Sequence, residues 1–241
     1  MRKHILILFL LIANVIYVFG QYEEVRKELD EVYKRSLPYT KSYTERSSPP
    51  SIPFTAPLLK KMELPVFIYD DYECAQKTYV NPMHASGVAR FTTETHDCEV
   101  ALFCIADECY SAHRYLLATF DKTGKRIDYI EVGLGWESGV CLELFSIDTA
   151  MQVVVNKLTP MEKEPVHKYD FKSFTGYRTD TYYQILANGE IIKTKEVVFE
   201  PQLYYPPKPT EEEIYYFFIS TGDEKVKTIK ECNERVSSPY P

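Results

Sequence analysis

The sequence has few glycines and none of the short motifs that bind nucleotides or metals. Its 241 residues include 9 glycines and a single tryptophan. Gly133-x-Gly135 has neither the third glycine nor the following helix of a dinucleotide-binding loop, and there is no phosphate-binding loop. His-Glu-x-x-His and Cys-x-x-Cys are also missing. These absences exclude the familiar signatures of nucleotide-dependent enzymes and zinc hydrolases, and we expect no cofactor and no metal.

Basic clusters are missing as well. Asp and Glu total 35 against 28 Lys and Arg, which gives a net charge of −7, and no run of basic residues occurs. This balance argues against nucleic acid and against an anionic membrane surface as partners. With 45% hydrophobic and 26% charged residues the composition is that of a globular protein. The length suits one domain with its own core.

The only long apolar run lies at the N-terminus. Arg2 and Lys3 precede the apolar residues 5–12, which continue after Ala13 and Asn14 to Phe19. The run holds about 15 apolar residues, whereas a bilayer span needs about 20. We therefore predict a secretory signal peptide over residues 1–20, with a retained membrane anchor as the alternative. The expected protein is secreted, periplasmic or attached to the cell surface, and has no integral membrane segment after cleavage.

Residues 21–61 are predicted to form an amphipathic helix and a linker. Val25, Leu29, Val32 and Tyr33 make one apolar stripe within a helix over 22–36. Such a helix either docks on the body of the protein or waits for a partner. Residues 37–57 contain five prolines and no periodicity, which is typical of a linker with polyproline character.

From residue 62 to 200 the hydrophobic pattern has a period of two. Short strands are expected over 64–69 and 98–105, the second apolar on both faces. Three hairpins are expected around the turns Asp-Lys-Thr-Gly at 121–124, Asp-Thr-Ala at 148–150 and Asn-Gly at 188–189. No helical segment is long enough for parallel crossovers. The sequence thus predicts a mainly β domain, an antiparallel meander that closes into a sandwich, a small barrel or a curled sheet.

The last segment, 201–241, reads as a C-terminal extension packed on the β domain. Within it, residues 211–220 are ambiguous. Thr210 and Glu213 fit the capping box of a helix, but the aromatic run that follows fits a strand, which we favour.

Part of the β pattern resembles a group of known sequences. The segment 115–128, Tyr-Leu-Leu-Ala-Thr-Phe-Asp-Lys-Thr-Gly-Lys-Arg-Ile-Asp, is followed by Phe-Ser-Ile-Asp at 145–148 and by the Asn-Gly hairpin at 183–191. This succession is similar to secreted, β-rich hypothetical proteins common in Bacteroidota, over about residues 110–195. The resemblance implies export and a β fold, and it brings no activity with it.

Six cysteines in an exported chain favour disulfide bonds. A pair between Cys98 and Cys104 is excluded if they lie on one strand, because their Cα atoms would be about 20 Å apart. Cys104 could instead close a hairpin with Cys109. Buried thiols, or a metal site that includes His96 and His113, are the alternatives. The disulfide candidates are Cys74, Cys98, Cys104, Cys109, Cys141 and Cys232.

Candidate binding residues gather around the single tryptophan. Gly135 to Gly139 resembles a nucleophile elbow, but its serine is one position late and the segment lies between strands. Trp136 and Glu137 are the candidate binding residues, and Glu131 and Glu143 flank them in sequence. An aromatic ring beside carboxylates suits a sugar.

The function that these patterns favour is that of an exported, non-catalytic β protein, a binding, adhesion or envelope-associated module. Its expected partner is an unidentified protein or glycan. The alternative is a secreted hydrolase directed at glycan or peptide, with carboxylates near the Trp136 loop. No catalytic residue is assigned, and whether the protein is an enzyme stays open at this point.

Overall fold

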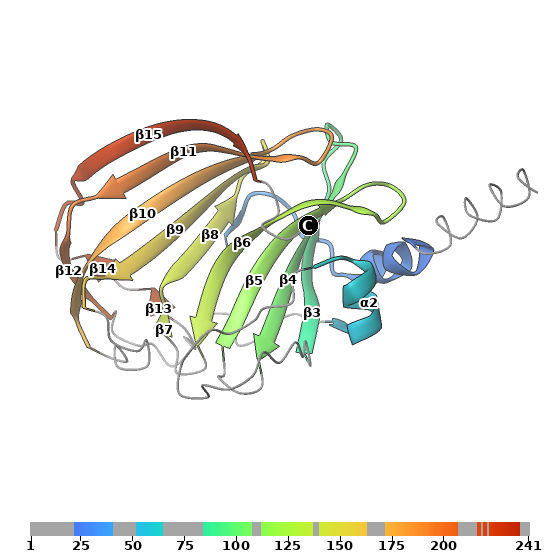
Figure 1. The fold of residues 1–241 in the computed structure, drawn as a ribbon, viewed down its shortest axis with the longest axis horizontal. Helices are drawn as coiled ribbons and strands as arrows, with labels where there is room; N and C mark the ends of the chain where they lie inside the picture. Colours follow the sequence, from blue (N-terminus) through green and yellow to red (C-terminus); the bar gives the residue numbers. More distant parts are fainter. Residues whose placement is uncertain are drawn as a thin grey trace, which may run out of the picture.

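The structure is a computed structural model, and it describes residues 22–40, 52–64, 84–107, 112–136, 140–162, 172–206, 216–217, 219–220 and 222–236. Within these residues the protein is mainly β, with two sheets and two short helices (Figure 1). All strand pairs are antiparallel except one short pair. Neither sheet closes on itself among the described strands. The predicted fold class is therefore confirmed, in its sandwich or curled-sheet form.

The first sheet has seven strands in the order β13-β7-β6-β5-β4-β3-β2. Its centre is an antiparallel meander, and the parallel exception is β13 beside β7 at one edge. The strands are β2 (Ile52–Phe54), β3 (His84–Phe91), β4 (Glu99–Asp107), β5 (Ala112–Phe120), β6 (Arg126–Trp136), β7 (Val140–Cys141) and β13 (Tyr216–Phe217).

The second sheet has eight strands in the order β1-β8-β9-β10-β11-β15, with β12 and β14 extending one end of β10. It continues the meander, because β8, β9, β10 and β11 follow one another both in sequence and in space (Figure 1). The strands are β1 (Tyr39–Thr40), β8 (Glu143–Ile147), β9 (Gln152–Pro160), β10 (Phe174–Ile185), β11 (Ile191–Phe199), β12 (Gln202–Tyr205), β14 (Ile219–Ser220) and β15 (Val226–Arg235).

The three predicted hairpins are present. In the turn between β5 and β6, the Asp121 carboxylate accepts the backbone N–H groups of Thr123 and Lys125 at 2.8 and 3.0 Å. Gly124 there has a φ of 92°, a conformation that favours glycine. Asp148 accepts two backbone N–H groups in the same way between β8 and β9. The side chains that make these turns are the ones that marked them in the sequence.

The tip of the β10–β11 hairpin fixes the second sheet against the first. Gly189 has a φ of 89°, and a Cβ atom added there would lie 2.4 Å from the Ile127 side chain and 3.0 Å from Cys98. The Thr119 hydroxyl donates a 2.6 Å hydrogen bond to the Gly189 carbonyl. The loop before β4 adds a second contact, since the Asp97 N–H donates to the Ala187 carbonyl. The two sheets therefore meet closely at this end.

A hydrophobic core fills the space between the sheets near that tip. From the first sheet it takes one face of β3 to β6, and from the second sheet the inner face of β8 to β11. The largest of its fully buried side chains are Phe91, Leu102, Leu117, Phe145, Ile147 and Met151. Burial of this apolar surface holds the sandwich together.

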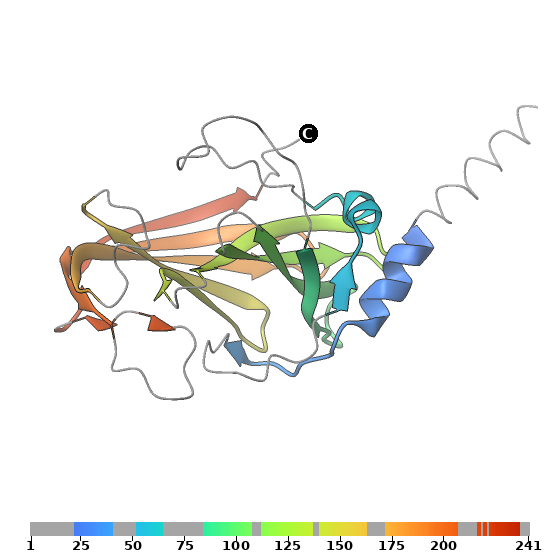
Figure 2. The same ribbon diagram turned by 90° about the horizontal axis from the view of Figure 1, so that it is seen from below.

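A second core lies on the opposite face of the first sheet. The helix over residues 22–31 buries Val25 and Leu29 there, together with Val32 just beyond it. Helix α2 (Ala56–Lys61) packs into the same core beside Phe103 of β4. Figure 2 shows both helices on the side of the first sheet. Because β4 contributes to both cores, it is apolar on both faces, as its sequence predicts. The N-terminal helix thus docks on the body of the protein, and it ends at residue 31, earlier than the predicted 36.

The segment predicted as a proline-rich linker contains regular structure in its described parts. Tyr39–Thr40 forms β1, which pairs with β8, and Ile52–Phe54 forms β2, which pairs with β3. Pro53 is tolerated because β2 is an edge strand of its sheet. Tertiary pairing supplies order in these short stretches that the local pattern does not reveal.

The second sheet also continues past residue 200, where only a packed extension was expected. β12 pairs with β10, and the ten-residue β15 pairs with β11 along its length. Residues 216–217 and 219–220 are strands, which agrees with the favoured reading of 211–220. The predicted strand over 64–69 lies outside the described residues except for Leu64. No described helix is both long and apolar enough to cross a membrane.

Candidate functional site

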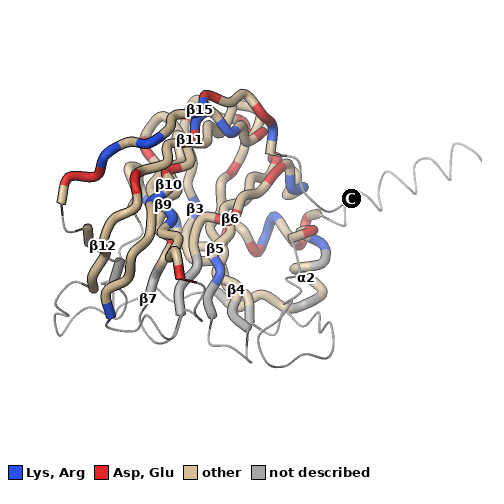
Figure 3. Tube along the Cα trace, turned by 60° about the vertical axis from the view of Figure 1, so that its left-hand side comes forward, with Lys and Arg blue, Asp and Glu red and all other residues tan. Residues whose placement is uncertain are grey.

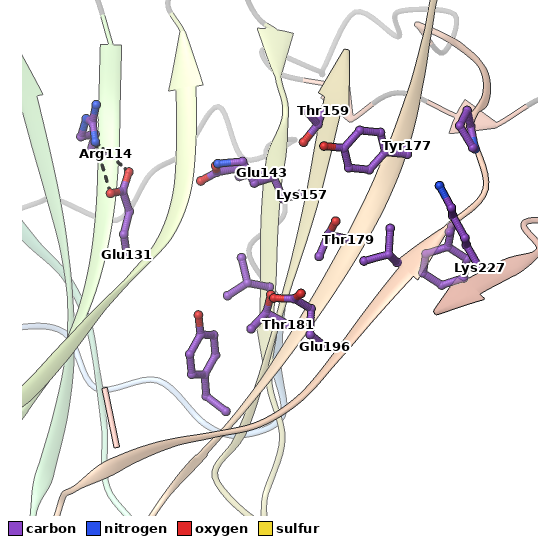
Figure 4. A pocket seen from close by; sticks show the side chains of 15 residues that line it. Arg114, Glu131, Glu143, Lys157, Thr159, Tyr177, Thr179, Thr181, Glu196 and Lys227 are labelled. Carbon is purple, nitrogen blue, oxygen red and sulfur yellow. Dashed lines mark hydrogen bonds and ion pairs between the residues drawn. The ribbon is translucent and has the colours of Figure 1, made fainter. Parts of the chain in front are cut away.

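The two sheets diverge away from the β10–β11 tip and enclose a cavity of about 850 Å³. Arg114 of β5 and Glu131 of β6 line it from the first sheet. The remaining lining comes from β8 to β11, β15 and Pro201, which directly precedes β12. Figure 4 shows the two groups, with the Arg114–Glu131 pair at one side and the side chains of the second sheet at the other.

The alternation of side chains along β9 and β10 determines which residues form the floor of the cavity. Every second side chain of β9 and β10 points to the same face of the sheet. Near the hairpin tip these inward positions are apolar and join the core, and further along the strands they become polar. The inward residues that line the cavity are Val155, Lys157 and Thr159 on β9 and Tyr177, Thr179, Thr181 and Tyr183 on β10.

The charged side chains of the lining balance one another. Three are carboxylates and three are cations, namely Glu131, Glu143, Glu196, Arg114, Lys157 and Lys227. The Arg114 Nη1 atom lies 3.1 and 3.2 Å from the two carboxylate oxygens of Glu131. The Lys157 Nζ atom lies 2.5 Å from Glu143 Oε1, and Lys193, next to the lining, lies 2.5 Å from Glu196. The formal charges of the lining thus sum to zero, and Lys227 has no ion-pair partner among the described residues.

Burial and neighbouring charges shift the pKa of several groups in and beside the cavity. Burial raises the pKa of Glu131, and the nearby charge of Glu143 raises it further, while Arg114 and Lys157 act in the opposite direction. Burial also raises the pKa of the Tyr183 hydroxyl, against the effect of Lys193. For Lys193, burial lowers the pKa, but the hydrogen bond and the charge of Glu196 prevail and raise it overall.

Five hydroxyl groups face this polar space without a described partner. They belong to Thr159, Thr179, Thr181, Tyr177 and Tyr183, and none of them forms a hydrogen bond to another described side chain or backbone group. Each hydroxyl is both a donor and an acceptor. The floor of the cavity therefore offers unused hydrogen-bonding groups beside charges of which five of six are in ion pairs.

The side chains of the two predicted binding residues, Trp136 and Glu137, are not described. Trp136 is the last residue of β6, and its side chain, like the whole of Glu137, falls outside the described part of the chain. Glu131 and Glu143, which flank them in sequence, are both in the cavity lining. Two of the three carboxylates in the cavity lining thus lie close to Trp136 in the sequence.

The residues that sequence reasoning missed come from β9, β10 and β11. Lys157, Thr179, Thr181 and Glu196 carry no motif. A signal was present in the strand pattern, because the apolar alternation of Val153 and Val155 gives way to Lys157 and Thr159 on the same face. Where one face of a strand changes from apolar to polar residues, the strand leaves the hydrophobic core.

The disulfide prediction is corrected for the cysteines that the structure describes. Cys98, Cys104 and Cys232 carry thiols, and no disulfide joins any two of them. Cys98 directly precedes β4 and Cys104 lies within it, so the extended chain separates them, and Cys232 lies on β15 in the other sheet. Burial raises the pKa of the Cys98 thiol to about 11. Cys74, Cys109 and the side chain of Cys141 lie outside the described residues.

Of the residues considered as metal ligands, the structure describes the side chains of His96, Cys98 and Cys104. His96 Nε2 donates a 3.1 Å hydrogen bond to the Ile185 carbonyl, while its Nδ1 atom contacts Thr93 and Thr95. In the part of the chain that is described, no three His, Cys, Asp or Glu side chains gather as a metal site requires.

Comparison of the chain with models of protein families, with curated proteins and with solved structures found no match.

Proposed function

We propose that the protein is an exported binding module whose cavity holds a neutral saccharide. The observation that carries this proposal is that five of the six charged lining residues lie in ion pairs beside five hydroxyls that have no described partner. The signal-like N-terminus supports a place outside the cytoplasm, where free and surface glycans are met.

The ion pairs of the cavity favour an uncharged ligand. An anion would compete with Glu143 for Lys157, and a cation would compete with Lys157 for Glu143, so that either would break an existing ion pair. An uncharged ligand keeps both pairs. Sugar hydroxyls donate to carboxylates and accept from ammonium and guanidinium groups, and they do both with the threonine hydroxyls.

The size and the aromatic content of the cavity agree with this class. A volume of about 850 Å³ lies in the range of small-molecule sites. Tyr177 and Tyr183 offer ring faces as well as hydroxyls, and such rings pack against the apolar face of a sugar.

The experiment is isothermal titration of the exported protein with maltose, cellobiose, lactose and N,N′-diacetylchitobiose, and with glucosamine and glucuronate as charged counterparts. We expect at least one neutral disaccharide to bind more tightly than either charged sugar. Thr179→Val and Thr181→Val keep the side-chain shape and each remove one hydroxyl, and each should weaken binding by about five- to tenfold. Thr40→Val, on β1 and outside the cavity, is the control and should bind as the unaltered protein does.

Two results would overturn the proposal: no neutral saccharide binds, or a charged sugar binds most tightly. Unchanged binding in both cavity variants would also contradict it.

One observation favours a second candidate, a glycan-directed hydrolase. Glu131, whose pKa is raised by burial, lies in the same cavity as Glu143, and a carboxylic acid beside a second carboxylate is the arrangement of glycosidases. In that function Glu131 donates a proton to the leaving oxygen. The test is release of nitrophenol from nitrophenyl glycosides, which Glu131→Gln should abolish. Binding without turnover by the unaltered protein would exclude this candidate.

A further inference from the structure

The inner face of β10 does not end with the cavity. Its cavity-facing residues run from Tyr183 to Tyr177, and Thr175 continues the same face by alternation. Leu203 of β12 lies directly opposite Thr175, and residues directly opposite in an antiparallel pair point to the same side. Leu203 therefore stands on the cavity face, and Tyr205, two residues further along β12, stands there as well.

A third apolar side chain comes from the other neighbour of β10. The N–H of Met161, which follows β9, donates a 2.9 Å hydrogen bond to the Thr175 carbonyl. Met161 is two residues beyond Thr159, whose side chain lines the cavity. We call Met161, Leu203 and Tyr205 the apolar rim.

The side chains of the apolar rim are exposed although they are large and hydrophobic. The exposed fractions are 58% for Met161, 44% for Leu203 and 39% for Tyr205. Single exposed apolar residues are normal on protein surfaces, but several on one face beside a cavity mark a binding surface. β12 itself, Gln-Leu-Tyr-Tyr, contains no charged residue, and it is drawn without charge in Figure 3, whereas charges of both signs line β15.

The dimensions of this face separate a polar part from an apolar part. A strand advances about 3.4 Å per residue, so the polar stretch from Thr181 to Tyr177 spans about 13 Å, the length of about two sugar rings. Thr175, with Leu203 beside it, lies about 7 Å beyond Tyr177. The order along the sheet is thus a polar cavity first and an apolar rim next to it.

We infer that the ligand is a neutral amphiphile, a glycoside whose sugar head occupies the cavity and whose alkyl chain lies along the apolar rim. This inference rests on the proposed function, because the sugar head is the ligand proposed there. The alkyl chain covers apolar surface that otherwise faces water, and the paired charges of the cavity remain paired.

The experiment compares maltose with hexyl, octyl and decyl β-D-maltoside, and glucose with the matching alkyl glucosides, all below their micelle concentrations. We expect the affinity to rise with chain length, by up to about fourfold for each methylene that is fully buried. Leu203→Ser and Tyr205→Ser should lose this dependence on chain length and keep the affinity for the head alone. Thr179→Val should weaken head and amphiphile by the same factor.

Ile229→Ser is the matched control. Ile229 on β15 is 61% exposed and lies outside the cavity lining and the rim, so it offers equal access to a detergent-like molecule. This variant should bind like the unaltered protein. A loss of chain-length dependence in Ile229→Ser as large as in Leu203→Ser would indicate unspecific adsorption and contradict the inference.

The remaining outcomes distinguish the two proposals. If the sugar head binds and the alkyl chain adds no affinity, the inference of an amphiphilic ligand is wrong, and the proposal of a saccharide site is supported. If the chain adds the same affinity to Leu203→Ser as to the unaltered protein, the apolar rim is not its site. If neither head binds with or without a chain, both proposals fall. Circular dichroism of each variant shows whether it is folded, and Leu203→Thr replaces Leu203→Ser if the serine variant is not.

Discussion

Thr119 and Gly189 lie 70 residues apart in the sequence, and the hydroxyl of the first donates a 2.6 Å hydrogen bond to the carbonyl of the second. The same hydroxyl accepts the N–H of Asp128 at 3.1 Å. Thr119 is fully buried, so this contact ties the tip of the second sheet to the middle of the first. Because the sheets are joined at this end, they diverge at the other, and the cavity lies there.

Thr119→Val removes both hydrogen bonds and keeps the shape of the side chain. The Gly189 carbonyl and the Asp128 N–H would lose a buried partner, at a cost of about 1–3 kcal/mol in the free energy of unfolding. Urea denaturation measures this loss. Thr159→Val, whose hydroxyl has no described partner, should change the free energy by about 0.5 kcal/mol or less. Equal effects of the two substitutions would contradict the role given to Thr119.

Gly189→Ala should destabilise the protein through both strain and crowding. The residue has a φ of 89°, and the added Cβ atom would lie 2.4 Å from the Ile127 side chain. We expect the free energy of unfolding to fall by about 2–4 kcal/mol, the summed cost of a left-handed backbone conformation for alanine and of overpacking. Gly222→Ala is the control, since nothing lies within 4 Å of its added Cβ atom. If the melting temperature falls no further for Gly189→Ala than for Gly222→Ala, the tip is not packed as described.

The docking of the N-terminal helix is tested by Leu29→Ala. Leu29 is fully buried in the core under the first sheet, so its truncation should cost about 2–5 kcal/mol. Lys27→Ala, two residues away on the exposed side of the same helix, should have little effect. If the helix did not pack on the sheet, the two substitutions would lower the melting temperature by equal, small amounts in thermal denaturation.

The carboxyl group of Glu131 should titrate above its ordinary value of 4.5, because it is buried. A raised pKa in the folded state means that the folded protein holds this proton more tightly than the unfolded chain does. The free energy of unfolding therefore falls as the pH rises from 4.5 through the folded-state pKa, and Glu131→Gln removes this fall. Carbon-detected NMR titration of the side-chain carboxyl measures the pKa directly.

Two variants test the causes of that shift with opposite signs. Arg114→Gln should raise the pKa of Glu131 further, and Glu143→Gln should lower it, because the first removes an attractive charge and the second a repulsive one. Shifts in the same direction would contradict the described cavity.

The thiols should differ in reactivity. Cys98 is buried and its pKa is about 11, so almost no thiolate forms at pH 8, whereas Cys232 on the edge strand β15 is accessible. Peptide mapping after brief iodoacetamide labelling should find Cys232 modified and Cys98 unmodified in the native protein. Recovery of Cys98 in a disulfide would restore the prediction made from the sequence.

The hairpins could be predicted from the sequence because their cause is local. Asp121 and Gly124 make one turn with their own side chain and backbone freedom, and Asn188-Gly189 makes another. The fold class follows from the same periodicity. β3 and β15 were missed because neither has a clear alternation. β3 is rich in small residues, because its sequence is His-Ala-Ser-Gly-Val-Ala-Arg-Phe and a helix packs on it. β15 is exposed on both faces.

Only some of the residues that line the cavity can be grouped from the sequence. Glu131 and Glu143 are close in sequence and were grouped, but Thr181 and Glu196 become neighbours only through the register of β10 with β11. Lys157 faces Glu143 for the same reason, by the register of β8 with β9. Such pairs depend on long-range strand pairing, which no local motif encodes.

The most direct test of the central claim is to map ligand contacts by NMR during titration with a neutral disaccharide. The account predicts that the amide and methyl shifts of Thr179, Thr181 and Val155, on the floor of the cavity, change most, with saturable dependence on concentration. Changes confined to other surfaces, such as the outer face of β15, or no saturable change with any neutral saccharide, would contradict it.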